Sequence, residues 1–367
     1  MAESFPVRFS VVMPTYRRLA TLERVLSAYE EQQPTELDFE IVVIDDGSDD
    51  GTAERLADWR SDRFRLRFDR QPNQGPAAAR NRALSLAEGT WVLFTGDDIE
   101  PTPDLLARHH RAHQTLADPR VAVLGHTAWH PDEPTTATMR HIDGVGSQQF
   151  SYYFMEDGAE YDFRHLYTSN VSLRLDFLRQ EPGPFSTAFP AAAFEDAELG
   201  FRLAERGMRI VYFRSAVAYH HHHYTVRSFY RRQQRCGEMA AVLESLHPEV
   251  QHLLGLDTLQ DLQLDLALAG PGRVGLSSRS ADDLLEQALD LAERHDPLPF
   301  SEIDGVLAAL FRIGYLDGLA RARFPTAADR LRARLVEDLL TPATEDFAAR
   351  SRERGLPFSP AVPSNSI

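Results

Sequence analysis

Three acidic pairs are the residues best suited to chemistry, because they lie just past apolar, strand-like runs or at a helix start beside one. They are Asp45-Asp46 in the turn that ends at Ser48, Asp97-Asp98 and Glu195-Asp196, and the run His220–His223 follows the third pair. Neighbouring carboxylates repel and shift each other's pKa values, so gathering them is costly unless they bind something. A nucleotide, a divalent metal ion and a substrate hydroxyl would each need one.

The elements that would position these acids alternate along the first hundred residues. Strands are predicted at 9–14, 40–44, 64–68 and 90–95, and helices at 19–33, 52–59 and 75–88. This alternation is typical of βαβ units, and it predicts an α/β fold with a Rossmann-like, doubly wound mixed sheet. Ligands of such sheets bind beyond the carboxyl ends of the strands, which is where the acids fall.

The pattern loosens downstream and then becomes helical. An irregular mixed sheet with long loops is predicted over 121–189, a helix at 194–207, and short strands at 210–213 and 216–219. Beyond residue 225 the segments are helical, with Ser280, Ser301 and Thr326 as predicted N-caps and 271–279 as a linker. We expect a nucleotide-binding half at 1–118 and an acceptor-binding half at 119–235 of one domain (1–235), a helical C-terminal region at 236–356, and a disordered tail at 357–367.

The overall composition excludes several classes of function. The chain has 367 residues, 43% of them hydrophobic, and a net charge of −16. This acidity argues against nucleic acid, whose phosphates require clustered basic residues, and against passive docking on anionic lipid. A single cysteine, Cys236, allows no intrachain disulfide and favours a cytoplasmic location. Neither a signal peptide at residues 1–8 nor a transmembrane segment is expected.

Six motifs in order resemble the inverting family 2 glycosyltransferases of the GT-A fold, over roughly residues 8 to 235. The motifs are Val12–Arg18, Ile44–Thr52, Asn73–Asn81, Phe94–Asp98, Ser169–Arg174 and Glu195–Leu203. Each is weak alone, and their shared order makes the resemblance specific. Two positions depart from the family: Gly96 stands where an acid is frequent, and Gly183–Thr187 replaces a frequent Gly-Gly-Phe-Asp-Glu.

The resemblance implies transfer of a sugar from a nucleotide-diphosphate sugar to an acceptor hydroxyl with inversion. The acceptor would be a sugar, a lipid-linked molecule or a small molecule. The residues implied at the nucleotide are Pro14, Tyr16, Arg17, Asp46, Arg80 and Asp97. Asp46 suits this role because a carboxylate at a strand end can accept a hydrogen bond from a base or a ribose. The alternative is a plain turn in which an Asp caps the next helix.

Asp98, with weaker help from Asp97, is the expected ligand of a divalent ion, Mn²⁺ or Mg²⁺, that absorbs the charge of the leaving diphosphate. Alternation along an extended segment places His220 and His222 on one side and the other two histidines of the run on the opposite side. In the family a histidine after such a strand completes the metal shell, so His220 and His222 are predicted ligands. The alternative is a surface Asp-Asp turn with bystander histidines.

An inverting transfer needs a base that takes the proton of the acceptor hydroxyl. The resemblance assigns this role to Asp196, with Glu195 raising its pKa or orienting the acceptor. The alternative is a helix N-terminus that favours acids through the macrodipole.

Arg227, Arg231 and Arg235 lie four residues apart and share one helix face. They would either neutralise a diphosphate or an anionic acceptor, or form salt bridges with the acidic C-terminal helices. The helical region itself could cover the acceptor site or form a homodimer. The rival functions are a retaining transferase acting on a small acceptor, a nucleotidyltransferase, and an inactive scaffold of the same fold.

Overall fold

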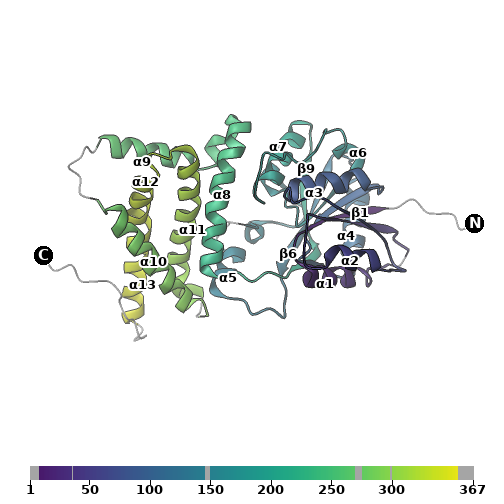
Figure 1. Ribbon diagram of the computed structural model, residues 1–367, viewed down its shortest axis with the longest axis horizontal. Coiled ribbons are helices and arrows are strands. Elements are labelled where there is room, and N and C mark those ends of the chain that lie inside the picture. Colours follow the sequence, from purple (N-terminus) through teal and green to yellow (C-terminus); the bar gives the residue numbers. More distant parts are fainter. Residues whose placement is uncertain (1–7, 35, 145–148, 269–274, 298–299, 354–367) are drawn as a thin grey trace, which may run out of the picture. The chain divides into compact units, whose positions relative to one another are not determined.

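The computed structural model describes residues 8–34, 36–144, 149–268, 275–297 and 300–353, without the side chains of 300–302. Contacts divide the chain into two compact units (Figure 1). One comprises Met1–Pro134 and Phe150–His222, and the other comprises Thr135–Gln149 and His223–Ile367. The division therefore falls at His222, where the sequence suggested residue 235, and the segment Thr135–Gln149 groups with the C-terminal helices.

The first unit is built on a nine-stranded mixed sheet. Its strands are β1 (Phe9–Thr15), β2 (Phe39–Asp45), β3 (Arg65–Arg70), β4 (Trp91–Thr95), β5 (Ile99–Pro101), β6 (Val121–Trp129), β7 (Glu160–Tyr161), β8 (Asn170–Arg174) and β9 (Arg209–His220). The spatial order is β3-β2-β1-β4-β8-β6-β9-β5, with β7 paired to β9. The pairs among β1 to β4 are parallel, while β8 is antiparallel to β4 and β6. The predicted α/β fold with a mixed sheet is confirmed.

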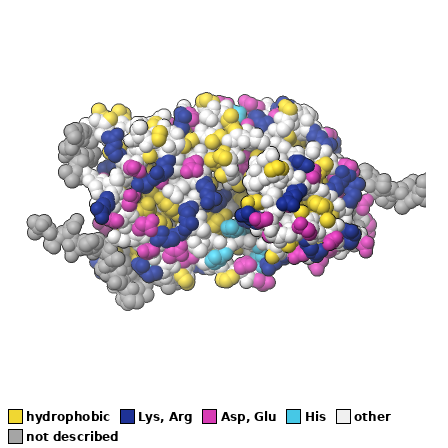
Figure 2. Space-filling model, viewed as in Figure 1, with side chains coloured by type: hydrophobic (Ala, Val, Ile, Leu, Met, Phe, Trp, Pro, Cys, Tyr) yellow, Lys and Arg dark blue, Asp and Glu magenta, His cyan; other side chains and the backbone are white. Residues whose placement is uncertain are grey.

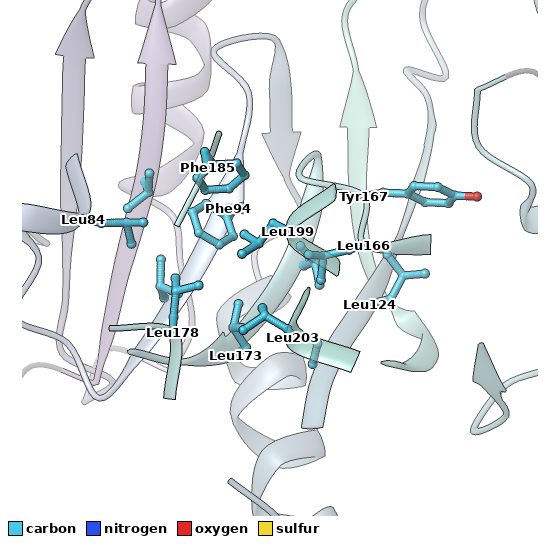
Figure 3. Packing of buried hydrophobic residues seen from close by; sticks show 14 of the residues in the cluster. Leu84, Phe94, Leu124, Leu166, Tyr167, Leu173, Leu178, Phe185, Leu199 and Leu203 are labelled. Atoms are coloured by element: carbon cyan, nitrogen blue, oxygen red, sulfur yellow. The ribbon is translucent and has the colours of Figure 1, made fainter. Parts of the chain in front are cut away.

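Helices cover both faces of this sheet because its central strands are apolar on both sides. The helices of the first unit are α1 (Leu19–Tyr29), α2 (Thr52–Asp58), α3 (Pro76–Leu86), α4 (Leu105–Leu116), α6 (Leu175–Leu178) and α7 (Glu195–Glu205), with short 3₁₀ helices η1 (Tyr152–Phe154) and η2 (Phe163–His165). On β1, Val12 packs in the cluster that contains residues of α3 and α7, whereas Val11 and Met13 pack in the cluster that contains residues of α1 and α4. Figure 3 shows part of the first cluster, where Phe94 of β4 meets Phe185 and the leucines of α7.

Strand β9 corrects the prediction of two short strands at 210–213 and 216–219. It is continuous from Arg209 to His220, and its parallel pairing with β6 shifts register between Gly125 and His126. Phe213 pairs with Gly125, and the next paired residue is Val217. A bulge thus absorbs the intervening residues without ending the strand. Continuity matters because it carries the histidines at the end of β9 to the edge of the sheet.

The second unit is helical, as predicted. Its helices are α5 (Ala137–Gly144), α8 (Val226–Leu246), η3 (Pro248–Leu253), α9 (Leu256–Leu268), α10 (Ser278–His295), α11 (Phe300–Arg323), α12 (Ala328–Leu335), the π-helical η4 (Val336–Leu340) and α13 (Thr341–Glu353). Within the described residues, none of the helices is both long enough and apolar enough to cross a membrane.

The predicted N-caps of these helices are misplaced. Helix α10 begins at Ser278, and its cap is Ser277, whose hydroxyl accepts the N–H of Ser280 at 3.1 Å. Thr326 precedes the cap position of α12, which Ala327 occupies without a side-chain bond. Capping depends on where the chain leaves the helix axis, which tertiary packing sets. The Ser301 side chain, residues 271–274 of the predicted linker and the tail at 357–367 lie outside the described residues.

Helices α8 and α11 approach so closely that their glycines admit no side chain. A Cβ on Gly318 would lie 1.9 Å from the carbonyl oxygen of Gln234, and one on Gly237 would lie 1.9 Å from that of Tyr315. Backbone atoms cannot move aside as side-chain ends can, so the two helices would have to separate. By contrast, a Cβ on Gly305, also in α11, would meet nothing within 4 Å.

Gly318→Ala should lower the free energy of unfolding by about 1–3 kcal/mol, because it overpacks the α8–α11 contact. Gly305→Ala is the matched control in the same helix, and it should raise that free energy by about 0.5–1 kcal/mol through helix propensity. Urea denaturation followed by circular dichroism measures both. Equal effects of the two substitutions would show that the helices are not in backbone contact.

Candidate active site

The candidate site lies where β1, β2 and β4 end at one edge of the sheet. These strands are adjacent and parallel, so their last residues come to the same side. The N–H of Asp46 donates to the carbonyl of Thr15 at 2.9 Å, which joins the ends of β1 and β2. The Thr15 hydroxyl donates to Asp97 Oδ2 at 2.7 Å, which joins β1 to the loop after β4. Two of the predicted acidic pairs thus meet at this edge.

Asp97 and Asp98 are buried side by side and share one arginine. Arg18 Nη1 lies 3.4 Å from Asp97 Oδ1 and bonds to Asp98 Oδ2. Burial and the charge of Asp98 raise the pKa of Asp97 to about 7. Burial also opposes ionisation of Asp98, but the interactions with His220 and Arg18 outweigh it and hold the pKa of Asp98 well below its ordinary value. Asp98 is therefore the permanently charged member of the pair.

His220 and His222 lie beside Asp98, on the same side as the alternation predicted. His220 Nε2 is 3.4 Å and His222 Nδ1 is 3.9 Å from Asp98 Oδ2. The His220 ring stacks on Trp129 at 5.4 Å and on His222 at 5.4 Å between ring centres. Histidine side chains gather on one part of the face shown in Figure 2, among interspersed acidic and basic residues. Stacking restricts both imidazole planes, so their nitrogens stay directed at one carboxylate oxygen.

These three side chains fit a divalent ion. The ligand atoms of Asp98, His220 and His222 all lie within 4.8 Å of one another. Ligands held about 2.1 Å from one ion lie about 3.0–3.5 Å apart, so only a small closing movement is needed. One carboxylate with two imidazoles suits Mn²⁺ better than Mg²⁺, which prefers oxygen ligands alone.

His221 belongs to a separate network. Arg24 lies 3.0 Å from its Nδ1 and can only donate there, so the ring carries its proton on Nε2, which donates to Glu100 Oε2 at 2.6 Å. His130 stacks on His221 at 4.3 Å. Glu100, His130 and His221 also have ligand spacing, but both nitrogens of His221 are engaged by hydrogen bonds. The backbone N–H of His221 donates to the backbone carbonyl of Asp98 at 2.8 Å. This bond and the side-chain network together hold the histidine segment beside Asp98.

Asp46 organises a loop. Its Oδ1 accepts from the Gln71 amide at 2.8 Å and from the Gln74 N–H at 2.9 Å, and its Oδ2 accepts from the Gly75 N–H at 2.8 Å. The side chain is almost fully buried. Neither of the two sequence interpretations included these bonds, which hold the loop before α3 against the end of β2. A direct contact of Asp46 with a nucleotide stays a prediction.

Pro14, Tyr16 and Arg17 form the segment that leaves the sheet at the end of β1. Tyr16 is 39% exposed, and the Arg17 guanidinium lies 5.1 Å from the centre of its ring. Arg17 pairs with Asp49 at 2.8 Å and has a φ of 53°. An aromatic ring at the strand edge is thereby left accessible to a planar ligand.

Arg80 and Glu195 form a buried ion pair. Arg80 Nη1 lies 2.8 Å from Glu195 Oε1, and the guanidinium lies 5.3 Å from the ring centre of Phe185. Arg80 is the charge partner of Glu195, and its predicted place near the nucleotide stays a prediction. The pair links α3 to the start of α7, which positions the third acidic pair.

Asp196 follows at the second position of α7. The residue before the helix, Phe194, has a φ of 67°, which is uncommon outside glycine and often marks functional sites. Asp196 Oδ1 accepts the N–H of Ala197 at 2.8 Å. Burial and the adjacent Glu195 raise the pKa of Asp196 to about 7, against the opposing charge of Arg80. A carboxyl group with this pKa can take up and release a proton near neutrality.

Gly96 explains one departure from the family pattern. A Cβ at this position would lie 2.7 Å from Asp98 Oδ1. A side chain at this position would therefore require the Asp98 carboxylate to move from its present place beside Arg18.

Arg227, the first of the three arginines that share one face of α8, forms salt bridges with acidic residues. In the second unit it lies 2.8 Å from Glu286 and 2.5 Å from Asp290, both on α10. Salt bridging to the acidic C-terminal helices is therefore its observed role.

Sequence reasoning missed several residues around Asp98. Arg18 is the last residue of the motif Val12–Arg18, so its place in that motif could have indicated a role at the site. Glu100 follows Asp98 by two residues. Trp129 and His130 gave no signal, because only the pairing of β6 with β9 brings them to this edge.

Comparison with known proteins bears on the N-terminal unit. Residues 10–178 match the family described as glycosyl transferase family 2. The validoxylamine A glucosyltransferase of Streptomyces hygroscopicus subsp. jinggangensis is 31% identical over 222 residues, which are 54% of this chain and 52% of that protein. The uncharacterized glycosyltransferase YfnE of Bacillus subtilis is 37% identical over 109 residues, or 29% of this chain and 27% of that protein. The chain therefore matches about half of the length of these relatives, or less.

A solved structure supports the fold. The mannosyltransferase PcManGT from Pyrobaculum calidifontis, in complex with GDP-Man and Mn²⁺, is 22% identical with a TM-score of 0.52, covering 85% of this chain and 88% of that one. The fold is thus similar to that of GT-A glycosyltransferases, and residues 10–178 match the glycosyl transferase family 2.

Proposed function

We propose that this protein is a metal-dependent glycosyltransferase that moves a sugar from a nucleotide-diphosphate sugar to an acceptor hydroxyl with inversion. One observation carries the proposal. A carboxylate of lowered pKa faces two imidazoles at the edge of the sheet where Tyr16 is exposed, and Asp196, with a pKa of about 7, starts a neighbouring helix. The anomeric configuration of the product, read by NMR, tests inversion against retention.

The donor would bind at the ends of β1 and β2. Tyr16 offers a ring face for stacking on a base, and Arg17 and Asp97 offer a donor and an acceptor beside it. Asp46 would act by holding the loop before α3. The cited mannosyltransferase was solved with GDP-Man and Mn²⁺, which makes nucleotide-diphosphate sugars with Mn²⁺ the first donors to assay.

Asp98, His220 and His222 would hold the metal ion. When bound there, a divalent ion supplies Lewis-acid stabilisation of the charge on the leaving diphosphate. The residues around it have structural tasks. Trp129 orients the His220 ring, and the His221 network fixes the backbone between the two ligand histidines.

Asp196 would act as the base. Its Oδ1 accepts the Ala197 N–H, and the backbone of Thr168 also bonds to this carboxyl group, so the side chain is held in place at the start of α7. Burial and the neighbouring Glu195 keep the pKa of Asp196 high, while Glu195 itself is paired with Arg80. The acceptor would be a sugar, a lipid-linked molecule or a small molecule, and the helical unit would serve acceptor binding or dimerisation.

Asp196→Asn keeps the shape of the side chain and removes its basicity. We expect transfer to fall by at least about 10²-fold with little change in nucleotide binding. Steady-state kinetics and calorimetric titration of the nucleotide diphosphate measure the two quantities. Near-normal transfer would move the role of base to another residue, and Glu195→Gln would be examined next.

The pH profile should report the raised pKa of Asp196. Because a base must be deprotonated, kcat/KM should rise about tenfold per pH unit below pH 7 and level off above it. The pKa of Asp97 is raised similarly, so Asp97→Asn is the control and should keep the rising limb. A profile that is flat between pH 5.5 and 8 would contradict the assignment.

Substitutions can distinguish the proposed metal ligands from His221, which lies between two of them in the sequence. Asp98→Ala should abolish Mn²⁺ binding, and His220→Ala should weaken it about 10- to 100-fold, as measured by electron paramagnetic resonance of free Mn²⁺. His221→Gln is the control, because this residue bonds to Glu100 and Arg24, and it should change Mn²⁺ affinity much less. Comparable losses in both histidine variants would place the metal elsewhere.

A further inference from the structure

Asp98 Oδ2 is approached by three cationic or metal-ligating groups at once. Arg18 Nη1 bonds to this oxygen, and His220 Nε2 and His222 Nδ1 lie 3.4 Å and 3.9 Å from the same oxygen. Arg18 also lies 3.4 Å from Asp97 Oδ1. The guanidinium thus shares Asp98 Oδ2 with the two histidines that are proposed to hold a divalent ion together with Asp98.

Two buried neighbouring carboxylates need a positive charge. Asp97 and Asp98 are 6% and 9% exposed, and burial without a cation penalises the charged form of each. Arg18 supplies that charge to both. An arginine cannot neutralise itself by losing a proton, so its positive charge persists at every physiological pH.

Displacing the Arg18 guanidinium would not break the hydrogen bonds that begin its own helix. Its side chain is 41% exposed. At the start of α1 the Arg18 carbonyl accepts the N–H groups of Thr21 and Leu22, while the Asp50 carboxylate accepts the N–H of Leu19. The guanidinium takes no part in these bonds, so its displacement leaves the helix start intact.

We propose that Arg18 is an internal counter-cation: it neutralises the Asp97–Asp98 pair before a divalent ion binds, and the incoming ion displaces it. The inference rests on the metal site of the proposed function. Metal affinity in this protein is then set by competition with a tethered guanidinium. Arg18 directly follows the Pro14–Arg17 segment, where the donor is proposed to bind, so an anionic diphosphate attracts the released guanidinium. Nucleotide and metal therefore favour each other's binding, as reciprocal coupling requires.

Removing the competitor should tighten metal binding. Without nucleotide, Arg18→Gln should bind Mn²⁺ about tenfold more tightly than the wild type, since a unit charge beside a carboxylate changes its interaction with another cation by about that factor. Electron paramagnetic resonance of free Mn²⁺ measures this directly and requires no catalysis. Arg18→Lys retains the charge and should stay within about threefold of the wild type.

Arg108→Gln is the control outside the site. It removes an arginine of α4 that pairs with Asp104 at 2.7 Å, and it should leave Mn²⁺ affinity without nucleotide unchanged. The gain in Mn²⁺ affinity on adding a nucleoside diphosphate should also be smaller in Arg18→Gln than in the wild type. Thermal unfolding without metal shows whether each variant is folded.

The outcomes separate this inference from the proposed function. Unchanged or weaker Mn²⁺ binding by folded Arg18→Gln, while Asp98→Ala abolishes binding, would overturn the role of Arg18 alone. Failure of the wild type to bind Mn²⁺ with or without nucleotide would overturn the metal site and the inference together.

Discussion

Buried carboxylates must be matched by cations or by N–H donors, and the first unit is organised around that requirement. Asp46 is matched by a side-chain amide and two backbone N–H groups, Glu195 by Arg80, and Asp98 by Arg18 and His220. Each match joins elements that are distant in sequence. The bonds that neutralise the acids are thus the bonds that fix the loops at the edge of the sheet.

Asp97 and Asp196 are buried carboxyl groups without a cation of their own, and this explains why their pKa values are raised. Asp97 shares Arg18 with Asp98, and Asp196 lies next to Glu195, which is paired with Arg80. Burial with a like-charged neighbour raises the pKa of both groups to about 7. The same pairing principle therefore produces a fixed charge at Asp98 and proton-exchanging groups at Asp97 and Asp196.

The histidine run shows how one segment serves two purposes. His220 and His222 face the Asp98 carboxylate, while His221 faces Glu100 and Arg24. Opposite directions of successive side chains allow one short stretch to present ligands and to be anchored at once. The anchoring network keeps the two presented imidazoles in place without occupying the proposed site.

The sequence by itself determined strands β1 to β4, the helices between them and the order of the acids, because apolar periodicity and turn residues act over a few neighbouring positions. It also indicated which histidines face together. Only the tertiary structure decided that Arg18 meets Asp98 from 80 residues away, that Arg80 neutralises Glu195 from 115 residues away, and that the loop before α3 satisfies Asp46. Helix caps and the continuity of β9 were settled there too. These contacts depend on strand pairing and loop paths, which no local pattern encodes.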